Sequence, residues 1–197
     1  MSTVHIATSR PVGHACLQWA AKNLPPEWEY ETDPDRCDVF ISVMYAHLVS
    51  EQFIEKRRCY NFHPGILPQY RGSGAFSWAI LNGEKTCGIT LHELDVNIDS
   101  GPIIEVKKFP IEGWDTAGTL FHKGMKEMER MFREWFVRLL AGDYHSTPQD
   151  ASLARTYYRK DLRAAMDLTR QVRAFTFDGK EPAFYTDRNG QRHDLTW

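Results

Sequence analysis

The chain has 197 residues, of which 42% are hydrophobic and 25% are charged. This composition is typical of a folded globular protein and excludes a disordered or fibrous one, and the length favours one domain with a small appendage over two full domains. The formal net charge of −2 gives no global attraction to nucleic acid or to anionic membranes.

The four cysteines, at positions 16, 37, 59 and 87, lie far apart and form no C-x-x-C pair. They predict free thiols in a reducing compartment and do not support a zinc or redox motif. The N-terminus lacks a basic segment followed by an apolar one, and no segment reaches the length of about 18 apolar residues that a membrane span needs. We therefore expect a cytoplasmic protein without membrane spans.

The first third of the chain predicts the beginning of an open α/β sheet. Short strands are expected over residues 4–7 and 28–32, with a helix over about 14–23 between them. The run 38–43 is nearly continuous in apolar character, as expected for a central parallel strand that is covered on both faces. A dinucleotide site is not predicted, because the G-x-G-x-x-G fingerprint is absent.

Residues 45–49 follow the carboxyl end of this central strand, where open α/β sheets bind their ligands. Ser50 is well placed to cap a helix that runs to about residue 56. For Tyr45 and His47, the residues alone favour a capped helix entry over a binding site.

Two polar side chains, Asn61 and His63, occupy alternate positions near the end of the next strand. Because side chains alternate between the two faces of a strand, both lie on the same face. Prolines and a glycine at positions 64, 65 and 68 then impose a fixed loop, which leads to a short helix over about 73–81.

A further strand is expected over residues 87–94, where apolar residues at 89 and 91 alternate with polar residues at 90 and 92. This alternation predicts a single buried face. The polar loop that follows delivers Asp99 from the end of this strand towards Asn61 and His63.

An amide, an imidazole and a carboxylate that meet at strand ends can polarise a carbonyl, hold an oxyanion and move a proton. This chemistry needs no protein nucleophile and fits direct attack by an amine on a bound acyl donor. Taken singly, an Asn at a strand end is commonly a turn former and a His is commonly structural. The order and spacing of the three residues favour the functional interpretation.

Four motifs in the same order carry a resemblance to a known family: residues 61–64 (NFHP), 67–72 (LPQYRG), 88–92 (GITLH) and 99–101 (DSG). They resemble the signature of the folate-dependent formyltransferases, which include the glycinamide ribonucleotide, methionyl-tRNA and amino-sugar N-formyltransferases. The match covers about residues 38–110, and the tail is more weakly similar to the amino-sugar branch.

The resemblance implies that Asn61, His63 and Asp99 are catalytic. Asn61 would orient the formyl group, His63 would stabilise the oxyanion, and Asp99 would tune His63 and relay the proton of the attacking amine. It further implies 10-formyltetrahydrofolate as co-substrate, with no metal, and a folate pocket formed by Met44, Tyr45, His47, Leu48, Val49, Asp95, Val96 and Asn97.

The implied fold is α/β: an abbreviated Rossmann-like, mostly parallel open sheet flanked by helices, with a small C-terminal helix and hairpin extension. The sheet is abbreviated because only two strands are expected before residue 38, where longer family members carry more β-α units. We expect a catalytic domain over residues 1–142 and an extension over 143–197 that packs on the same domain.

The second half of the chain predicts one long core helix over residues 116–140, capped by Asp115 or Thr116. A polar linker is expected over 145–150, an amphipathic helix over 162–172, and a hairpin turn near residue 190. The tail carries several basic residues interleaved with Asp161 and Asp167, a pattern that favours a solvated face over an anion site: Arg155, Arg159, Lys160, Arg163, Arg170 and Arg173.

The acceptor is expected to be the amine of a nucleotide-linked amino sugar, with Tyr70, Arg71 and Trp78 assigned to substrate binding. Core packing is an equally good interpretation for Trp78. A tRNA acceptor is excluded because it would require a further basic domain, so no nucleic acid partner is expected. Glycinamide ribonucleotide and an amino acid or peptide-synthesis intermediate remain alternative acceptors. The sequence is also compatible with a homodimer.

Two further classes compete with this interpretation. A metal enzyme would use His63, His92, Asp95 and Asp99, but the chain lacks the compact ligand pairs of strong zinc sites. A non-catalytic folate or nucleotide binding module would result if the short N-terminal half had lost the active site. The intact set of Asn61, His63 and Asp99 argues against that.

Overall fold

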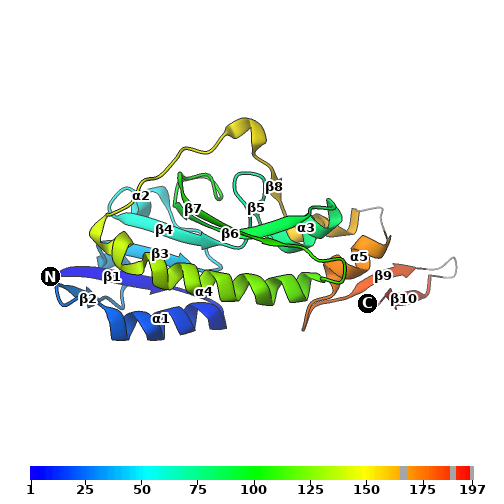
Figure 1. Cartoon of the computed structure of the whole chain (residues 1–197), viewed down its shortest axis with the longest axis horizontal. Coiled ribbons are helices and arrows are strands. Elements are labelled where there is room, and N and C mark those ends of the chain that lie inside the picture. Colours follow the sequence, from blue (N-terminus) through cyan, green and yellow to red (C-terminus); the bar gives the residue numbers. More distant parts are fainter. Residues whose placement is uncertain (165–167, 187–189, 196–197) are drawn as a thin grey trace.

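A computed structural model describes residues 1–164, 168–186 and 190–195. Within them, the main sheet has six strands in the order β2-β1-β3-β4-β6-β7 (Figure 1). The first four strands run parallel, whereas β6 is antiparallel to β4 and β7 is antiparallel to β6. The strands are β1 (Ser2–Ala7), β2 (Trp28–Tyr30), β3 (Val39–Val43), β4 (Arg58–His63), β6 (Thr86–Glu93) and β7 (Ile103–Pro110). The predicted mostly parallel, open sheet is confirmed.

Strand β3 is buried along its whole length and lies between β1 and β4, as its apolar run predicts. Because its side chains alternate, residues 39, 41 and 43 join the larger core cluster, whereas Phe40 packs in a smaller cluster on the opposite face. Ser42 lies on the same face as Phe40, and its neighbour in register on β4 is Asn61. The sheet therefore presents its polar side chains on the face away from the larger core.

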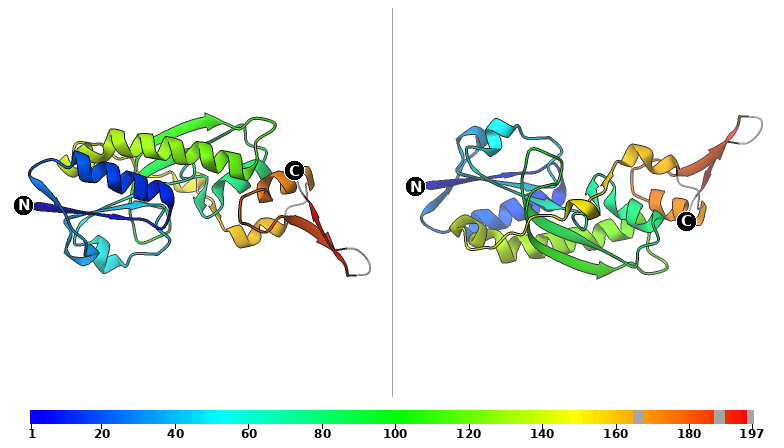
Figure 2. Two further views of the ribbon diagram at one scale, coloured as in Figure 1. Left: turned by 90° about the horizontal axis from the view of Figure 1, so that it is seen from below. Right: turned by 90° about the horizontal axis from the view of Figure 1, so that it is seen from above.

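The larger core is closed by α1 (Pro11–Asn23) and α4 (Ala117–Ala141), which lie side by side on one face of the sheet (Figure 2). Trp19 of α1 meets Phe132 and Phe136 of α4 edge-on, with ring centroids 6.3 and 6.0 Å apart. The short helix α2 (Glu51–Ile54) covers the other face, where Phe53 packs against Phe40.

The long helix α4 begins where the sequence predicts. Thr116 is its N-cap and forms a reciprocal capping box with Thr119, while Asp115 accepts a hydrogen bond from the Thr119 hydroxyl. The helix ends at Gly142, which has the left-handed φ of 72° that a C-terminal cap requires. Of the two predicted caps, Thr116 is confirmed.

The prediction of one buried face for β6 is wrong. Thr90 and His92 are as fully buried as Ile89 and Leu91. The loop after β4 covers the polar face, because the Thr90 hydroxyl donates to the Gly65 carbonyl and accepts from the Leu67 N–H. Polar side chains here are buried by hydrogen bonding and not exposed to solvent.

The connections around the site are short. Helix α3 (Ala75–Leu81) begins two residues later than predicted, because its N-cap Gly74 adopts a left-handed φ of 80°. Strand β5 (Arg71–Gly72), just before it, pairs in parallel with β8 (Thr156–Tyr157) of the C-terminal region. The loop that precedes the helix is therefore held by a segment more than 80 residues further along the chain.

The C-terminal region packs onto the same core. Leu162, Ala174 and Phe175 belong to the larger core cluster, and the Ser77 hydroxyl on α3 donates to the Ala174 carbonyl at 2.7 Å. Of the predicted amphipathic helix over 162–172, residues 162–164 end a 3-10 helix and residues 168–172 begin an α-helix, while residues 165–167 lie outside the described residues. The hairpin is confirmed as an antiparallel pair, although residues 187–189 of its turn lie outside the described residues. The elements are η1 (Pro34–Arg36), η2 (Ala151–Leu153), η3 (Arg159–Ala164), α5 (Leu168–Phe175), β9 (Ala183–Thr186) and β10 (Arg192–Leu195).

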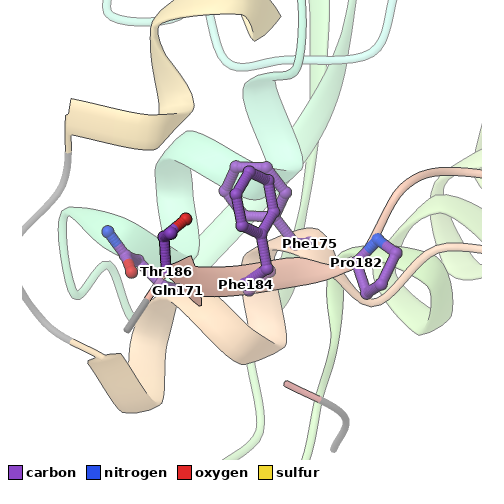
Figure 3. Close-up of a pocket in the computed structure, with 6 residues that line it drawn as sticks. Gln171, Phe175, Pro182, Phe184 and Thr186 are labelled. Carbon is purple, nitrogen blue, oxygen red and sulfur yellow. The ribbon is translucent and has the colours of Figure 1, made fainter. Parts of the chain in front are cut away.

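A cavity of about 270 Å³ lies between α5 and β9 (Figure 3). The rings of Phe175 and Phe184 line the middle of the cavity, with Pro182 at one end and Gln171 and Thr186 at the other. None of the residues that line it carries a charge, so it lacks the acid, base and anion-binding groups of a reaction centre.

All four cysteines are free and buried, as predicted. Burial raises the pKa of Cys16, Cys59 and Cys87 to about 12, which keeps these thiols protonated and unreactive. Within the described residues, none of the helices combines the length and the apolar character that a membrane span requires.

Candidate active site

The three predicted catalytic side chains meet at one point. Asn61 and His63 project from the same face of β4, and Asp99 approaches them from the loop between β6 and β7. His63 Nδ1 lies 3.3 Å from Asp99 Oδ2, and Asn61 Nδ2 donates to Asp99 Oδ1 at 3.4 Å. The structure thus brings an amide, an imidazole and a carboxylate within hydrogen-bonding range.

The protonation of His63 follows from its partners. Its Nε2 lies 2.7 Å from the backbone carbonyl oxygen of Tyr70, which can only accept, so Nε2 carries a hydrogen. A second proton on the ring must therefore bind Nδ1, facing Asp99. Burial lowers the pKa of His63, and the charge of Asp99 acts in the opposite direction. The neutral ring thus offers Nδ1 as a proton acceptor.

Asp99 remains ionised over a wide pH range. Burial alone would raise its pKa, but the neighbouring rings of His63 and His92 and the N–H of Gly72 together hold the pKa of this carboxyl well below its usual value. The Gly72 N–H donates to Oδ2 at 2.8 Å. Asp99 also has a left-handed φ of 49°, which is uncommon for a residue other than glycine and often marks a functional position.

The orientation of Asn61 is fixed from both sides. Its Oδ1 accepts from the Ser42 hydroxyl at 2.7 Å, and its Nδ2 lies 3.1 Å from His92 Nε2. His92 Nδ1 is 2.6 Å from the Glu93 carbonyl oxygen and so carries a hydrogen, which leaves Nε2 as an acceptor for the amide. The second hydrogen of Nδ2 points to Asp99, beside the cleft.

The cleft beside this cluster has a volume of about 170 Å³ and contains both Asn61 and Asp99 in its wall. Seven of the eight residues predicted to bind folate also line it: Tyr45, His47, Leu48, Val49, Asp95, Val96 and Asn97. Met44 does not line it; this residue has a left-handed φ of 55° and packs against the larger core.

The rim of the cleft is unusually apolar for a protein surface. Leu48 is 85% exposed, and Val96 and Ile98 are exposed as well. Exposed apolar side chains around a concave site with a few converging polar groups are typical of a ligand pocket. The cleft therefore combines an apolar surface for a flat ligand with the polar cluster at its wall.

The chain is similar in sequence to proteins of one known family. Residues 7–136 match the model of the formyl transferase family. The chain belongs to this family. GDP-perosamine N-formyltransferase from Brucella melitensis is 31% identical over 176 residues, which are 83% of this chain and 66% of that protein. Methionyl-tRNA formyltransferase from Kosmotoga olearia is 38% identical over 125 residues, covering 62% of this chain and 40% of that protein.

Solved structures of formyl transferases share the fold. A likely sugar N-formyltransferase from Mycobacterium tuberculosis superposes with a TM-score of 0.85 at 24% identity, covering 100% of this chain and 97% of that one. An N-formyltransferase from Helicobacter canadensis, in complex with folinic acid and dTDP-3-aminofucose, superposes with a TM-score of 0.77 at 22% identity, covering 90% and 81%.

The residues predicted to bind the acceptor lie apart from the lining of the cleft. The Tyr70 side chain is buried, stacks on Tyr157 with ring centroids 5.3 Å apart, and donates its hydroxyl hydrogen to Glu84 at 2.7 Å. Trp78 packs against the same Tyr157 ring at 4.8 Å, and its indole N–H donates to the Tyr158 carbonyl. Burial raises the pKa of Tyr70. These rings form a small aromatic stack between α3 and β8.

The sequence interpretation misses two further side chains that contact the cluster of Asn61, His63 and Asp99. Ser42 is the one polar residue in the apolar run 39–43, and a lone polar residue in a covered strand is a signal that could have found it. His92 was considered only as a metal ligand, although it accepts from Asn61 and lies 3.6 Å from Asp99.

The alternative metal set does not assemble. Asp95 accepts from the N–H of Val96 and from the Ser100 hydroxyl, while His63, His92 and Asp99 are engaged with one another and with Asn61. A search of the described residues for three or more His, Cys, Asp or Glu side chains arranged to hold a metal ion found no such group.

Proposed function

We propose that this chain transfers a formyl group from 10-formyltetrahydrofolate to the amine of a nucleotide-linked amino sugar. The observation that carries the proposal is the convergence of Asn61, Asp99 and the buried His63, of which Asn61 and Asp99 stand in the wall of an apolar-rimmed cleft. That cleft is lined by seven of the residues that the family signature assigns to folate binding. The chain spans only 66% of the length of the Brucella enzyme, so the acceptor is argued separately below.

The reaction proceeds by direct attack of the amine on the formyl carbon, without a covalent enzyme intermediate. Asn61, whose amide is oriented by Ser42 and His92, donates its remaining Nδ2 hydrogen to Asp99 Oδ1 over a long 3.4 Å, and this is the hydrogen that orients the formyl oxygen when the donor binds. As the new C–N bond forms, the amine nitrogen becomes positively charged and must lose a proton. The Asp99 carboxylate, in the cleft wall, accepts it.

The proton then has a short path to His63. Nδ1 of the neutral ring lies 3.3 Å from the carboxylate oxygen, so the proton can pass to the ring and produce an imidazolium. Its positive charge, in a buried position, stabilises the oxyanion of the tetrahedral intermediate. When the oxyanion collapses to the carbonyl of the new formamide, the bond from the formyl carbon to N10 of the folate breaks. The proton returns from His63 through Asp99 to N10, which restores the neutral ring, and tetrahydrofolate leaves.

The amino sugar is favoured as acceptor by two observations. The Brucella relative, at 31% identity, acts on GDP-perosamine, and the Helicobacter structure with a similar fold holds an amino-sugar nucleotide. The partly buried Trp78 and the exposed Tyr158, outside the lining of the cleft, offer aromatic surface on the side of α3 that the C-terminal region covers. Glycinamide ribonucleotide and an amino acid or peptide-synthesis intermediate are the alternative acceptors, and a non-catalytic folate-binding module is the alternative without a reaction.

A tetrahydrofolate-release assay distinguishes these functions. The protein is mixed with 10-formyltetrahydrofolate and, separately, with nucleotide-linked amino sugars, glycinamide ribonucleotide and simple amino acids. Turnover with one sugar nucleotide supports the proposal, and turnover only with another amine moves the protein to the alternative acceptor class. Folate binding with no turnover, unchanged in Asn61→Ala, would support the binding module.

Several expectations from the sequence stay predictions: location in the cytoplasm, a homodimer, the absence of a nucleic acid partner, and the boundary between residues 1–142 and 143–197. The boundary bears on function, because the extension supplies strand β8 beside the loop that holds Gly72.

A further inference from the structure

The backbone of Asp99 needs external support. Its left-handed φ of 49° is one that side-chain-bearing residues rarely adopt, and such conformations persist where surrounding contacts hold them. Its carboxylate is held by Gly72 and His63, but these contacts do not fix the peptide on either side. The peptide is held by a residue 50 positions further along the chain.

That residue is Gln149, in the segment between α4 and β8 (Figure 1). Its Nε2 donates to the carbonyl oxygens of Asp99, at 2.9 Å, and Gly101, at 2.7 Å. Its Oε1 accepts from Arg71 through Nε at 3.0 Å and Nη2 at 2.7 Å. The amide thus donates both of its hydrogens to carbonyl oxygens of the Asp99 loop, and its oxygen accepts from the Arg71 guanidinium.

The orientation of this amide is unambiguous. Carbonyl oxygens can only accept and a guanidinium can only donate, so exchanging the amide oxygen and nitrogen of Gln149 would break all four hydrogen bonds. The segment itself is anchored next to it, because Thr147 and Ile103 exchange both backbone hydrogen bonds at 2.8 Å. Gln149 is therefore held in one orientation by its hydrogen bonds and is not a mobile surface side chain.

Arg71 and Gly72 connect Gln149 to the Asp99 carboxylate. Gly72, the next residue, donates its N–H to Asp99 Oδ2, while Arg71 holds the glutamine that binds the Asp99 carbonyl. Strand β5 therefore fixes Asp99 twice, through its side chain directly and through its backbone by way of Gln149. This gives Arg71, which the sequence assigned to substrate binding, a different set of contacts.

We propose that Gln149 is a positioning residue for formyl transfer, which sets the distance between the Asp99 carboxylate and His63. The inference rests on the proposed function and deepens it. Gln149 contacts neither the cleft nor the reacting atoms. It makes the region after α4 part of the active site, because Asp99 is correctly placed only when this region is docked.

The test compares Gln149→Leu and Gln149→Glu with the control Gln18→Leu, an exposed residue on α1. Both Gln149 variants lose the two donors to the Asp99 loop, whereas Gln149→Glu keeps an oxygen for Arg71. We expect kcat to fall about tenfold to a hundredfold in both, as for a small misplacement of a catalytic group. The KM for 10-formyltetrahydrofolate should stay within about twofold, because the cleft lining is untouched.

A second readout needs no substrate. The charge of Asp99 raises the pKa of His63, so releasing Asp99 should lower the pKa of the His63 ring, measured by NMR titration, in Gln149→Leu and not in Gln18→Leu. Gln149→Glu is left out of this readout, because its added carboxylate would itself raise that pKa. A purely structural anchor would change the melting temperature without moving this titration. If Gln149→Leu does not fold, the neutral Gln149→Met carries the test.

Unchanged kcat and unchanged His63 titration in Gln149→Leu, or in Gln149→Met where the first variant does not fold, would overturn the inference. A shifted titration in a protein that transfers no formyl group to any acceptor would instead overturn the proposed function and leave the positioning role intact. The two proposals can therefore be contradicted independently of each other.

Discussion

Replacing Asp99 by Asn tests the proton path most sharply, because the side chain keeps its shape and loses only its charge. The amide oxygen can still accept the hydrogen bond that the Gly72 N–H donates at 2.8 Å, so we expect the fold to persist. What disappears is the negative charge 3.3 Å from His63 Nδ1. The variant thus separates the electrostatic role of Asp99 from its structural one.

The magnitude follows from this distance. Two unit charges 3.3 Å apart interact by about 5 kcal/mol at an effective dielectric constant of about 20. Burial already lowers the pKa of His63 and the charge of Asp99 opposes this, so removing that charge should lower the pKa of His63 further and disfavour the imidazolium. Loss of the proton acceptor should reduce kcat by a factor of about 10² to 10⁴.

The assay follows tetrahydrofolate release in wild type, Asp99→Asn and the control Asp178→Asn, which removes an exposed carboxylate from the C-terminal region. Asp99→Asn should lose turnover while its circular dichroism spectrum and folate binding are retained, and the control should match wild type. Wild-type turnover in Asp99→Asn would refute the path from the amine through Asp99 to His63.

Three further outcomes are expected. Ser42→Ala removes the donor to Asn61 Oδ1 and should lower kcat about tenfold without loss of folate affinity, as measured by fluorescence titration; unaltered kcat would show that the amide needs no such support. Gly65→Ala should abolish turnover, because the added Cβ would come within 2.6 Å of His63 Nε2 and displace the ring, and an active variant with intact structure would contradict this placement. Since the folded-state pKa of Asp99 is depressed, the stability it contributes is present above its usual value of 3.8 and is lost as pH falls towards the folded value. Thermal unfolding below about pH 4 should thus be steeper with pH in wild type than in Asp99→Asn, and equal slopes would argue against the depressed pKa.

The elements that follow from local pattern could be predicted from the sequence. The apolar run of β3 requires a strand covered on both faces, and the 3.6-residue period with Thr116 as cap requires the long helix α4. The meeting of Asn61, His63 and Asp99 follows from strand alternation and from the motif order together. These are short-range signals or signals carried by the family signature.

What the sequence did not reveal depends on contacts between distant segments. The alternation in β6 suggested an exposed face, but the loop at residues 64–70 folds back over Thr90 and forms hydrogen bonds with its hydroxyl, while His92 is satisfied by Asn61 and the Glu93 carbonyl. Gln149 sits in a stretch of polar character that resembles a linker, and its role depends on pairing with residues 50 and 78 positions away. The polarity of a segment alone does not show whether it is a solvated linker or is fixed to the domain by hydrogen bonds.

The central claim is that the His63 and Asp99 pair drives formyl transfer to an amine bound at this cleft. The most direct measurement is tetrahydrofolate release from 10-formyltetrahydrofolate with a nucleotide-linked amino sugar, comparing wild type with His63→Ala. We expect turnover by the wild type and a decrease by several orders of magnitude in His63→Ala, with folate binding retained. Near-normal turnover in His63→Ala would contradict the account.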